Sequence, residues 1–128
     1  MGAISKWFAC SGEMMLARDT GDTAENAACT YLEEQNYTIL ERNFSCKMGE
    51  IDIIAQSPDD EVIFVEVRFR KSADFGGALE SITKSKQTKI RRTAEYYLIT
   101  HKMTGHACRM DVLALSPQKI EWIENAFY

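Results

Sequence analysis

The pattern of apolar and polar side chains divides most of the chain into helices and strands. Helical spacing of apolar residues predicts helices over residues 22–35 and 84–103, and Thr83 is placed to cap the second. Runs rich in branched and aromatic side chains predict strands at residues 37–46, 50–56, 62–70, 108–115 and 120–123. Residues 1–20 show no clear period and are expected to form an arm or a frayed helix. The order α-β-β-β-α-β, with one short further strand, predicts a single α/β domain over residues 21–128, with a mixed sheet flanked by helices.

A predicted hairpin brings two acidic residues together. Residues 57–60 contain Pro58 and two aspartates between two apolar runs, which is turn chemistry. If residues 58–60 form the loop, the register places Asp52 opposite Glu66, with β-carbons about 4.5–5.5 Å apart. Two ionised carboxylates at about 5 Å repel each other by roughly 3 kcal/mol at an effective dielectric constant of 20. A raised pKa, a neighbouring cation or a bound divalent metal is therefore expected to offset the repulsion.

Two further side chains are placed to join this pair. Arg68 follows Glu66 by two residues and so projects from the same face of its strand, and Glu25 lies at the edge of the apolar stripe of the first helix. Carboxylates, together with water and substrate phosphate, are the ligands that Mg²⁺ prefers, and such a site can hydrolyse phosphodiesters. Simpler interpretations stay open. Glu25 could complete a capping box with Asp22, Asp52 could face solvent, and Glu66 and Arg68 could form an ion pair of little consequence.

Charge is distributed unevenly, although the net charge is only −4. Residues 13–61 carry twelve acidic and three basic side chains, whereas residues 62–109 carry ten basic and four acidic ones. This asymmetry suits a protein that binds cations with one part and phosphates with another, and a mixed solvated surface is an equal alternative. Five cations and no acid open the second predicted helix, where the helix dipole adds to the positive field. The predicted nucleic-acid-binding residues are Arg70, Lys84, Lys86, Lys89, Arg91 and Arg92.

Gln87 stands out within this basic segment. It precedes Ile90 by three residues, so it is expected to point toward the sheet, where it could hold a metal-bound water or a phosphate. A buried amide satisfied by the backbone is an equal alternative.

Composition sets the remaining limits. With 45% hydrophobic and 27% charged residues the chain is typical of a globular protein, and no apolar run approaches the roughly 20 residues that span a bilayer. The four cysteines lie far apart without a C-x-x-C pair, so buried reduced thiols are expected in place of a zinc or redox motif. The first residues lack the pattern of a secretory signal, and the cytoplasm is the expected compartment.

Four motifs in order resemble the YraN family of uncharacterised bacterial proteins. They are GEIDIIA at residues 49–55, FVEVR at 64–68, TKSKQ at 83–87 and CRMDV at 108–112. That family is related by fold to the PD-(D/E)XK nucleases and to archaeal Holliday-junction resolvases. The resemblance therefore implies a restriction-endonuclease-like core, bound Mg²⁺ or Mn²⁺, and DNA as the substrate. It implies Glu25, Asp52 and Glu66 as metal ligands and adds Arg68 and Gln87 to the catalytic set.

Arg68 departs from the family pattern, in which lysine is usual at this position. Arginine stays protonated in proteins, so it cannot act as a general base, though it can stabilise the charge of a pentacovalent phosphate. The leading hypothesis is a metal-dependent endonuclease that acts on DNA, including branched DNA, with a homodimer expected from the resolvase-like relatives. The alternatives are a non-catalytic nucleic-acid-binding domain that keeps the nuclease fold, and an interaction protein that binds no nucleic acid.

Overall fold

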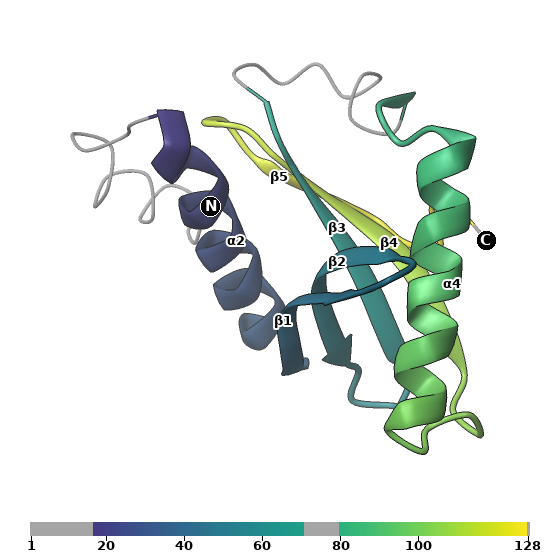
Figure 1. The fold of residues 1–128 in the computed structure, drawn as a ribbon. Helices are drawn as coiled ribbons and strands as arrows, with labels where there is room; N and C mark the ends of the chain where they lie inside the picture. The colour runs from purple at the N-terminus through teal and green to yellow at the C-terminus, as the bar shows by residue number, and fades with distance from the viewer. Residues whose placement is uncertain (1–16, 71–79, 128) are drawn as a thin grey trace.

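The protein folds as a five-stranded mixed sheet between two helices. A computed structural model describes residues 17–70 and 80–127. Its elements are α2 (Ala17–Glu34), β1 (Thr38–Cys46), β2 (Gly49–Gln56), β3 (Val62–Phe69), α4 (Lys84–Thr100), β4 (Cys108–Leu115) and β5 (Ile120–Ile123). The strands lie in the order β1-β2-β3-β4-β5, in which β3 and β4 run parallel and the other neighbours antiparallel. Figure 1 shows α2 and α4 on opposite sides of the sheet. The predicted α/β fold is confirmed, and the arrangement is consistent with a restriction-endonuclease-like core.

The helix boundaries differ from the predicted ones. α2 begins at Ala17 and so takes up the end of the segment expected to be an arm, while residues 1–16 lie outside the described residues. Asp22 lies inside this helix, so it is no N-cap and Glu25 does not complete a capping box with it. α4 ends at Thr100, earlier than predicted. Thr83 caps its start, as predicted, because the Thr83 hydroxyl accepts a hydrogen bond from the backbone N–H of Lys86 at 3.2 Å.

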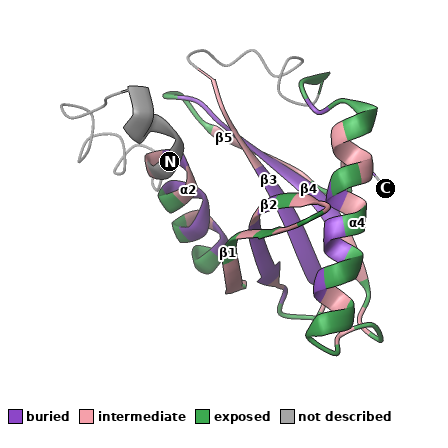
Figure 2. Ribbon diagram, in the orientation of Figure 1, coloured by how far each residue is buried: buried purple, intermediate pink, exposed green. Residues whose placement is uncertain are grey.

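Each face of the sheet carries its own core. Alternate side chains of β3 point to opposite faces, so Ile63 and Val65 pack on the α2 side while Val62 and Phe64 pack on the α4 side. The central strands are therefore buried on both faces, as Figure 2 shows. Glu66 follows Phe64 by two residues, so its side chain also lies on the α4 side of the sheet, near the end of β3.

The β2–β3 hairpin has the predicted register. The ladder runs from the pair Gln56 and Val62 to the pair Ile53 and Val65. The hydroxyl of Ser57 fixes the loop by accepting the backbone N–H groups of Asp59 and Glu61. Beyond Ile53, β2 continues to pair with β1 as far as Gly49. β2 and β3 therefore separate immediately before the two acidic residues that the sequence singles out.

Two further expectations concern the described residues alone. None of the helices in residues 17–70 and 80–127 is long and apolar enough to cross a membrane. Cys29, Cys46 and Cys108 are free cysteines; Cys29 is buried, as expected, whereas Cys46 and Cys108 are half-buried, and Cys10 lies outside the described part of the chain.

Candidate active site

The side chain of Asp52 spans the opening between β2 and β3. Its Oδ2 atom accepts a hydrogen bond from the backbone N–H of Val67 at 2.9 Å. The carboxylate thus replaces a strand-to-strand bond at the point where the ladder ends. The register is the predicted one. Asp52 and Glu66 nevertheless do not form the expected ladder pair, because β2 and β3 have already separated at that point.

Glu66 is a buried carboxylate with two cations beside it. Only 4% of its side chain is exposed, and its Oε2 atom lies 3.0 Å from Nζ of Lys86 and 3.3 Å from Nη2 of Arg68. Burial raises the pKa of Glu66, the negative charge of Asp52 raises it further, and the two cations lower it without cancelling the rise. The fold therefore disfavours the ionised form of this carboxyl group.

Glu25 approaches the same region from α2. Its Oε1 atom accepts a hydrogen bond from Asn43 at 3.1 Å and lies 3.4 Å from Nη2 of Arg42. Burial raises the pKa of Glu25, and the charge of Asp52 adds to the rise. The negative charge of Asp52 thus disfavours ionisation of both glutamates, one on α2 and one on β3.

The donor set suits a hard divalent cation with few protein ligands. Within the described residues, no three acidic, histidine or cysteine side chains stand close enough to enclose a metal ion, so the expected ligand triad is not preassembled. Mg²⁺ is commonly bound by one or two carboxylates plus water and substrate phosphate. Asp52 and Glu66 fit that requirement, because they repel each other at an opening of the sheet and both supply oxygen ligands.

Lys86 belongs to this site, which sequence reasoning missed by counting it only among the phosphate-binding cations. A signal was present in the helical spacing. Lys86 precedes Ile90 by four residues and Thr93 by seven, and both of these are buried against the sheet. The same face of α4 carries the Lys86 ammonium group to Glu66.

The other two predicted catalytic residues have local partners. The guanidinium of Arg68 donates to the Ser81 hydroxyl at 3.0 Å and lies against Glu66, so it ties the end of β3 to the segment before α4. The side-chain amide of Gln87 donates to the backbone carbonyl of Ile82 at 3.1 Å. That contact matches the alternative in which Gln87 is satisfied by the backbone, and it does not bring Gln87 to the carboxylates.

Comparison with known proteins places these residues in a family. The model of the uncharacterised protein family UPF0102 matches residues 24–115, a range that includes every residue of the site described above. The chain belongs to the UPF0102 family. This confirms the resemblance to the YraN family, since the two names describe the same group.

Relatives of this UPF0102 protein come from several bacteria. The UPF0102 protein of Saccharophagus degradans is 50% identical over 110 residues, which are 85% of this chain and 92% of that protein. The one of Cupriavidus metallidurans is 48% identical over 107 residues, or 84% of this chain and 79% of that one, and the one of Nitrosomonas europaea is 46% identical over 117 residues, or 89% and 98%. A crystal structure of a protein named SSO0001 aligns with a TM-score of 0.44 and 17% identity, over 93% of this chain and 56% of that one. That similarity is too low to inform function.

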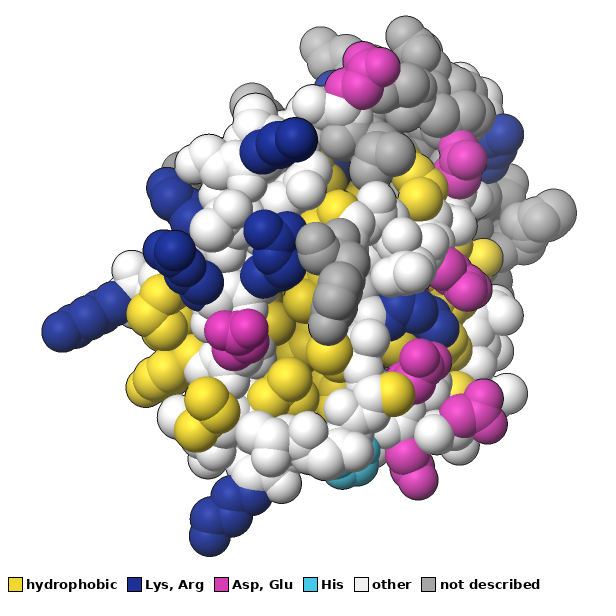
Figure 3. All heavy atoms as spheres, turned by 90° about the vertical axis from the view of Figure 1, so that its right-hand side faces the viewer, with side chains coloured by type: hydrophobic (Ala, Val, Ile, Leu, Met, Phe, Trp, Pro, Cys, Tyr) yellow, Lys and Arg dark blue, Asp and Glu magenta, His cyan; other side chains and the backbone are white. Residues whose placement is uncertain are grey.

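The predicted nucleic-acid-binding residues of this UPF0102 member differ in exposure and in their contacts. Lys84, Lys89 and Arg92 are exposed on α4. Lys86 is instead directed to Glu66, and Arg91 is half-buried with its guanidinium 3.4 Å from the Thr88 hydroxyl. Arg70 is half-buried directly after β3. On the face that α4 forms, most Lys and Arg side chains lie on the left and most Asp and Glu side chains on the right (Figure 3).

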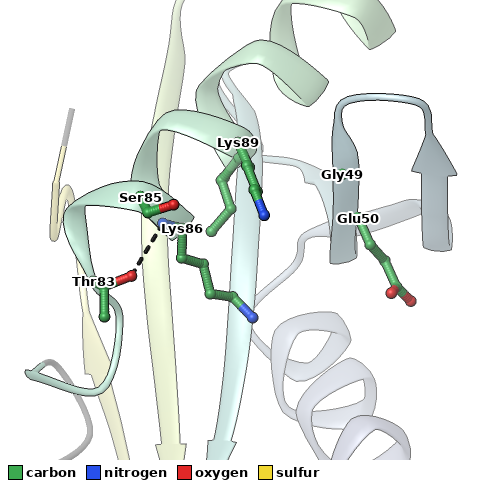
Figure 4. A pocket seen from close by; sticks show the side chains of 7 residues that line it. Gly49, Glu50, Thr83, Ser85, Lys86 and Lys89 are labelled. Carbon is green, nitrogen blue, oxygen red and sulfur yellow. Dashed lines mark hydrogen bonds between the residues drawn. The ribbon is translucent and has the colours of Figure 1, made fainter.

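A pocket of about 250 Å³ lies beside the site, between the start of α4 and the β1–β2 hairpin. Figure 4 shows Lys86 and Lys89 extending from α4 into the space that faces Gly49 and Glu50. The remaining lining residues are Thr83, Ser85 and Ile90. The hairpin stays close to the helix because Gly49 has no side chain; a Cβ atom there would lie 3.1 Å from the Thr93 hydroxyl.

Proposed function

We propose that this protein is a divalent-metal-dependent nuclease that hydrolyses phosphodiester bonds in DNA. One observation carries the proposal: Asp52 and the buried Glu66 repel each other where β2 and β3 separate, with the Lys86 and Arg68 cations at Glu66. A buried carboxyl group with a raised pKa beside a like charge is unfavourable for folding, and such groups concentrate at functional sites.

Each side chain has a distinct part in this proposal. Asp52 and Glu66 would each offer a carboxylate oxygen to Mg²⁺ or Mn²⁺, and the Val67 N–H would hold Asp52 in place. When bound, the metal would polarise a phosphoryl oxygen and lower the pKa of the attacking water. Arg68, fixed by Ser81, would orient the Glu66 carboxylate. Glu25 would add negative charge near Asp52, which favours a cation there.

Binding of DNA would rest on the exposed cations of α4. Lys84, Lys89 and Arg92 project from the helix whose first turns reach the site. Contacts of this kind neutralise phosphates and position a duplex without reading its sequence. Branched DNA and a homodimer are included in the proposal because the sequence motifs resemble those of the YraN family, which is related by fold to junction resolvases.

A non-catalytic nucleic-acid-binding domain is the second candidate. It is favoured by the engagement of one Glu66 oxygen with two cations, Lys86 and Arg68, which balance part of the charge without a metal. The two candidates differ in whether Asp52 and Glu66 bind a divalent ion.

The decisive experiment measures cleavage of labelled linear and four-way-junction DNA in Mn²⁺. Wild type is compared with Asp52→Asn, which keeps an oxygen to accept from Val67, and with Lys102→Met, an exposed residue beyond the end of α4. We expect wild type and Lys102→Met to cleave alike and Asp52→Asn to be at least about 100-fold slower, as for the loss of a metal ligand or its support.

The outcomes separate the two candidates. Equal cleavage by wild type and Asp52→Asn would overturn the nuclease proposal. Absence of cleavage by all three proteins, with salt-dependent DNA binding and no calorimetric Mn²⁺ binding, would select the non-catalytic domain.

A further inference from the structure

Two cations meet at the same oxygen of Glu66, but they differ in freedom. The Arg68 guanidinium also donates to the Ser81 hydroxyl at 3.0 Å and to the Val67 carbonyl at 3.4 Å, and 21% of its side chain is exposed. The Lys86 side chain is 43% exposed, and in the described residues its ammonium group has one acceptor, Glu66. Arg68 is thus held by several groups, whereas Lys86 is held by one and reaches solvent.

The position of Lys86 connects the acidic residues with the pocket between α4 and the β1–β2 hairpin. Its backbone lies in the first turn of α4, where its N–H is capped by Thr83. Its side chain lines the pocket of about 250 Å³ together with Lys89 (Figure 4), while its Nζ atom lies 3.0 Å from Glu66. Rotation of a flexible lysine stem can therefore move the ammonium group from the carboxylate to an anion in the pocket without a change of the backbone.

We infer that Lys86 is a catalytic residue of the proposed nuclease, and that its ammonium group contacts the scissile phosphate. This inference rests on the proposed function. In the hydrolysis, the water oxygen forms a bond to phosphorus, and the bond from phosphorus to one ester oxygen breaks with its electron pair moving to that oxygen. The proton lost by the water reaches solvent, and the leaving oxygen gains one from solvent. Lys86 keeps its proton throughout and balances the negative charge that grows on the non-bridging oxygens.

The same geometry makes Lys86 a competitor of the metal. Without substrate, its ammonium group occupies a place on Glu66 Oε2 that a divalent cation would take. Removal of this cation should therefore strengthen metal binding while it weakens catalysis. A purely structural ion pair would give no such combination, because its loss would loosen the site and weaken both.

The test compares Lys86→Met, Lys86→Arg and the control Lys102→Met with wild type. Single-turnover cleavage is measured at saturating DNA and Mn²⁺, and Mn²⁺ binding without DNA is measured by calorimetry. We expect Lys86→Met to cleave at least about 100-fold slower and to bind Mn²⁺ about three- to tenfold tighter. Lys86→Arg should recover at least about tenfold of the lost rate, because it keeps the charge, and Lys102→Met should match wild type in both measurements.

Each outcome decides a separate point. Cleavage by Lys86→Met within threefold of an active wild type would overturn the inference and leave the proposed function standing. Mn²⁺ binding by Lys86→Met that is unchanged or weaker than in wild type would also overturn it, since the competition would be absent. A wild type that cleaves no DNA would overturn the proposed function and the inference with it. Thermal unfolding shows whether Lys86→Met is folded; if it is not, Lys86→Gln, which is also uncharged, replaces it with the same expected outcomes.

Discussion

Two clusters of charged side chains on the same sheet differ in how well the charges are balanced. The first surrounds Asp111 on β4, whose side chain is fully buried. Its two oxygens accept hydrogen bonds from the Arg109 guanidinium at 2.9–3.2 Å, from the Trp122 indole at 2.8 Å and from the backbone N–H of Asn125 at 2.9 Å. Each Asp111 oxygen thus has donors from more than one segment, which is how a buried carboxylate is stabilised.

The positive charge of Arg109 has partners besides Asp111. Its guanidinium also lies 3.0 Å from Glu61 and donates to the Tyr37 hydroxyl at 3.2 Å. Hydrogen bonding to Asp111 is the main reason that the pKa of Arg109 is raised above its ordinary value. The cluster ties β4 to β5 and to the segments before β1 and β3, so it serves the fold.

In the second cluster, at Asp52 and Glu66, the cations do not fully compensate the buried negative charge. Glu66 is nearly as buried as Asp111, but burial and the charge of Asp52 outweigh the cations Lys86 and Arg68, so its pKa is raised. The comparison teaches that burial of a carboxylate does not by itself indicate function. The second cluster differs because ionisation of Glu66 lowers the stability of the fold. Such a cost is common where a protein gives up stability for activity.

Removal of the cation from the balanced cluster should have the largest effect. Arg109→Met would leave Asp111 charged and buried with only its Trp122 and Asn125 donors. Breaking a buried ion pair from one side costs about 3–5 kcal/mol. We expect that loss in the free energy of unfolding, measured in urea, with Lys102→Met unchanged. A loss under about 1 kcal/mol would show that the Asp111 cluster does not stabilise the fold as its geometry indicates.

Neutralisation of the second cluster should have the opposite sign. Glu66→Gln removes a carboxylate that the fold disfavours, and the partly exposed Lys86 ammonium can turn to water. We expect the free energy of unfolding at pH 7 to rise by about 1 kcal/mol, typical of a site where function opposes stability. Circular dichroism during urea unfolding measures it.

The pH dependence follows from the sign of the shift. Because the pKa of Glu66 is raised in the folded state, the unfavourable ionisation is absent below the unfolded pKa and develops as the pH rises through the folded pKa. The advantage of Glu66→Gln should therefore vanish below about pH 4 and grow as the pH rises above it. An advantage that grows toward acid pH would contradict the assigned shift.

Short-range patterns in the sequence predicted much of the fold and part of the site. The alternation in β3, the register of its hairpin with β2 and the Thr83 cap depend on neighbouring residues, and all three are confirmed. The early start of α2 at Ala17 was missed because the residues before Asp22 lack an apolar period.

The contacts that were not predicted depend on where elements end and meet. Asp52 binds Val67 because the β2–β3 ladder stops at Ile53, and no local pattern marks that stop. The donors of Asp111 include Trp122 and the backbone of Asn125, which reach it only after β5 turns back beside β4. The charge of Lys86 predicts phosphate binding, whereas its helical phase places it on the face of α4 that packs against the sheet, beside Glu66.

The smallest expected effect tests whether the second cluster is one electrostatic unit. Asp52 raises the pKa of Glu66, so Glu66→Gln should stabilise wild type more than it stabilises Asp52→Asn. We expect a coupling of about 0.5–1 kcal/mol from a double-mutant cycle at pH 7 without metal. Saturating Mn²⁺ should reverse the sign of the Glu66→Gln effect, because a bound cation turns two repelling carboxylates into two ligands and stabilises only the protein that binds it. A coupling energy of zero in both conditions would show that Asp52 and Glu66 act independently. Their proximity would then no longer support a metal ion bound by both.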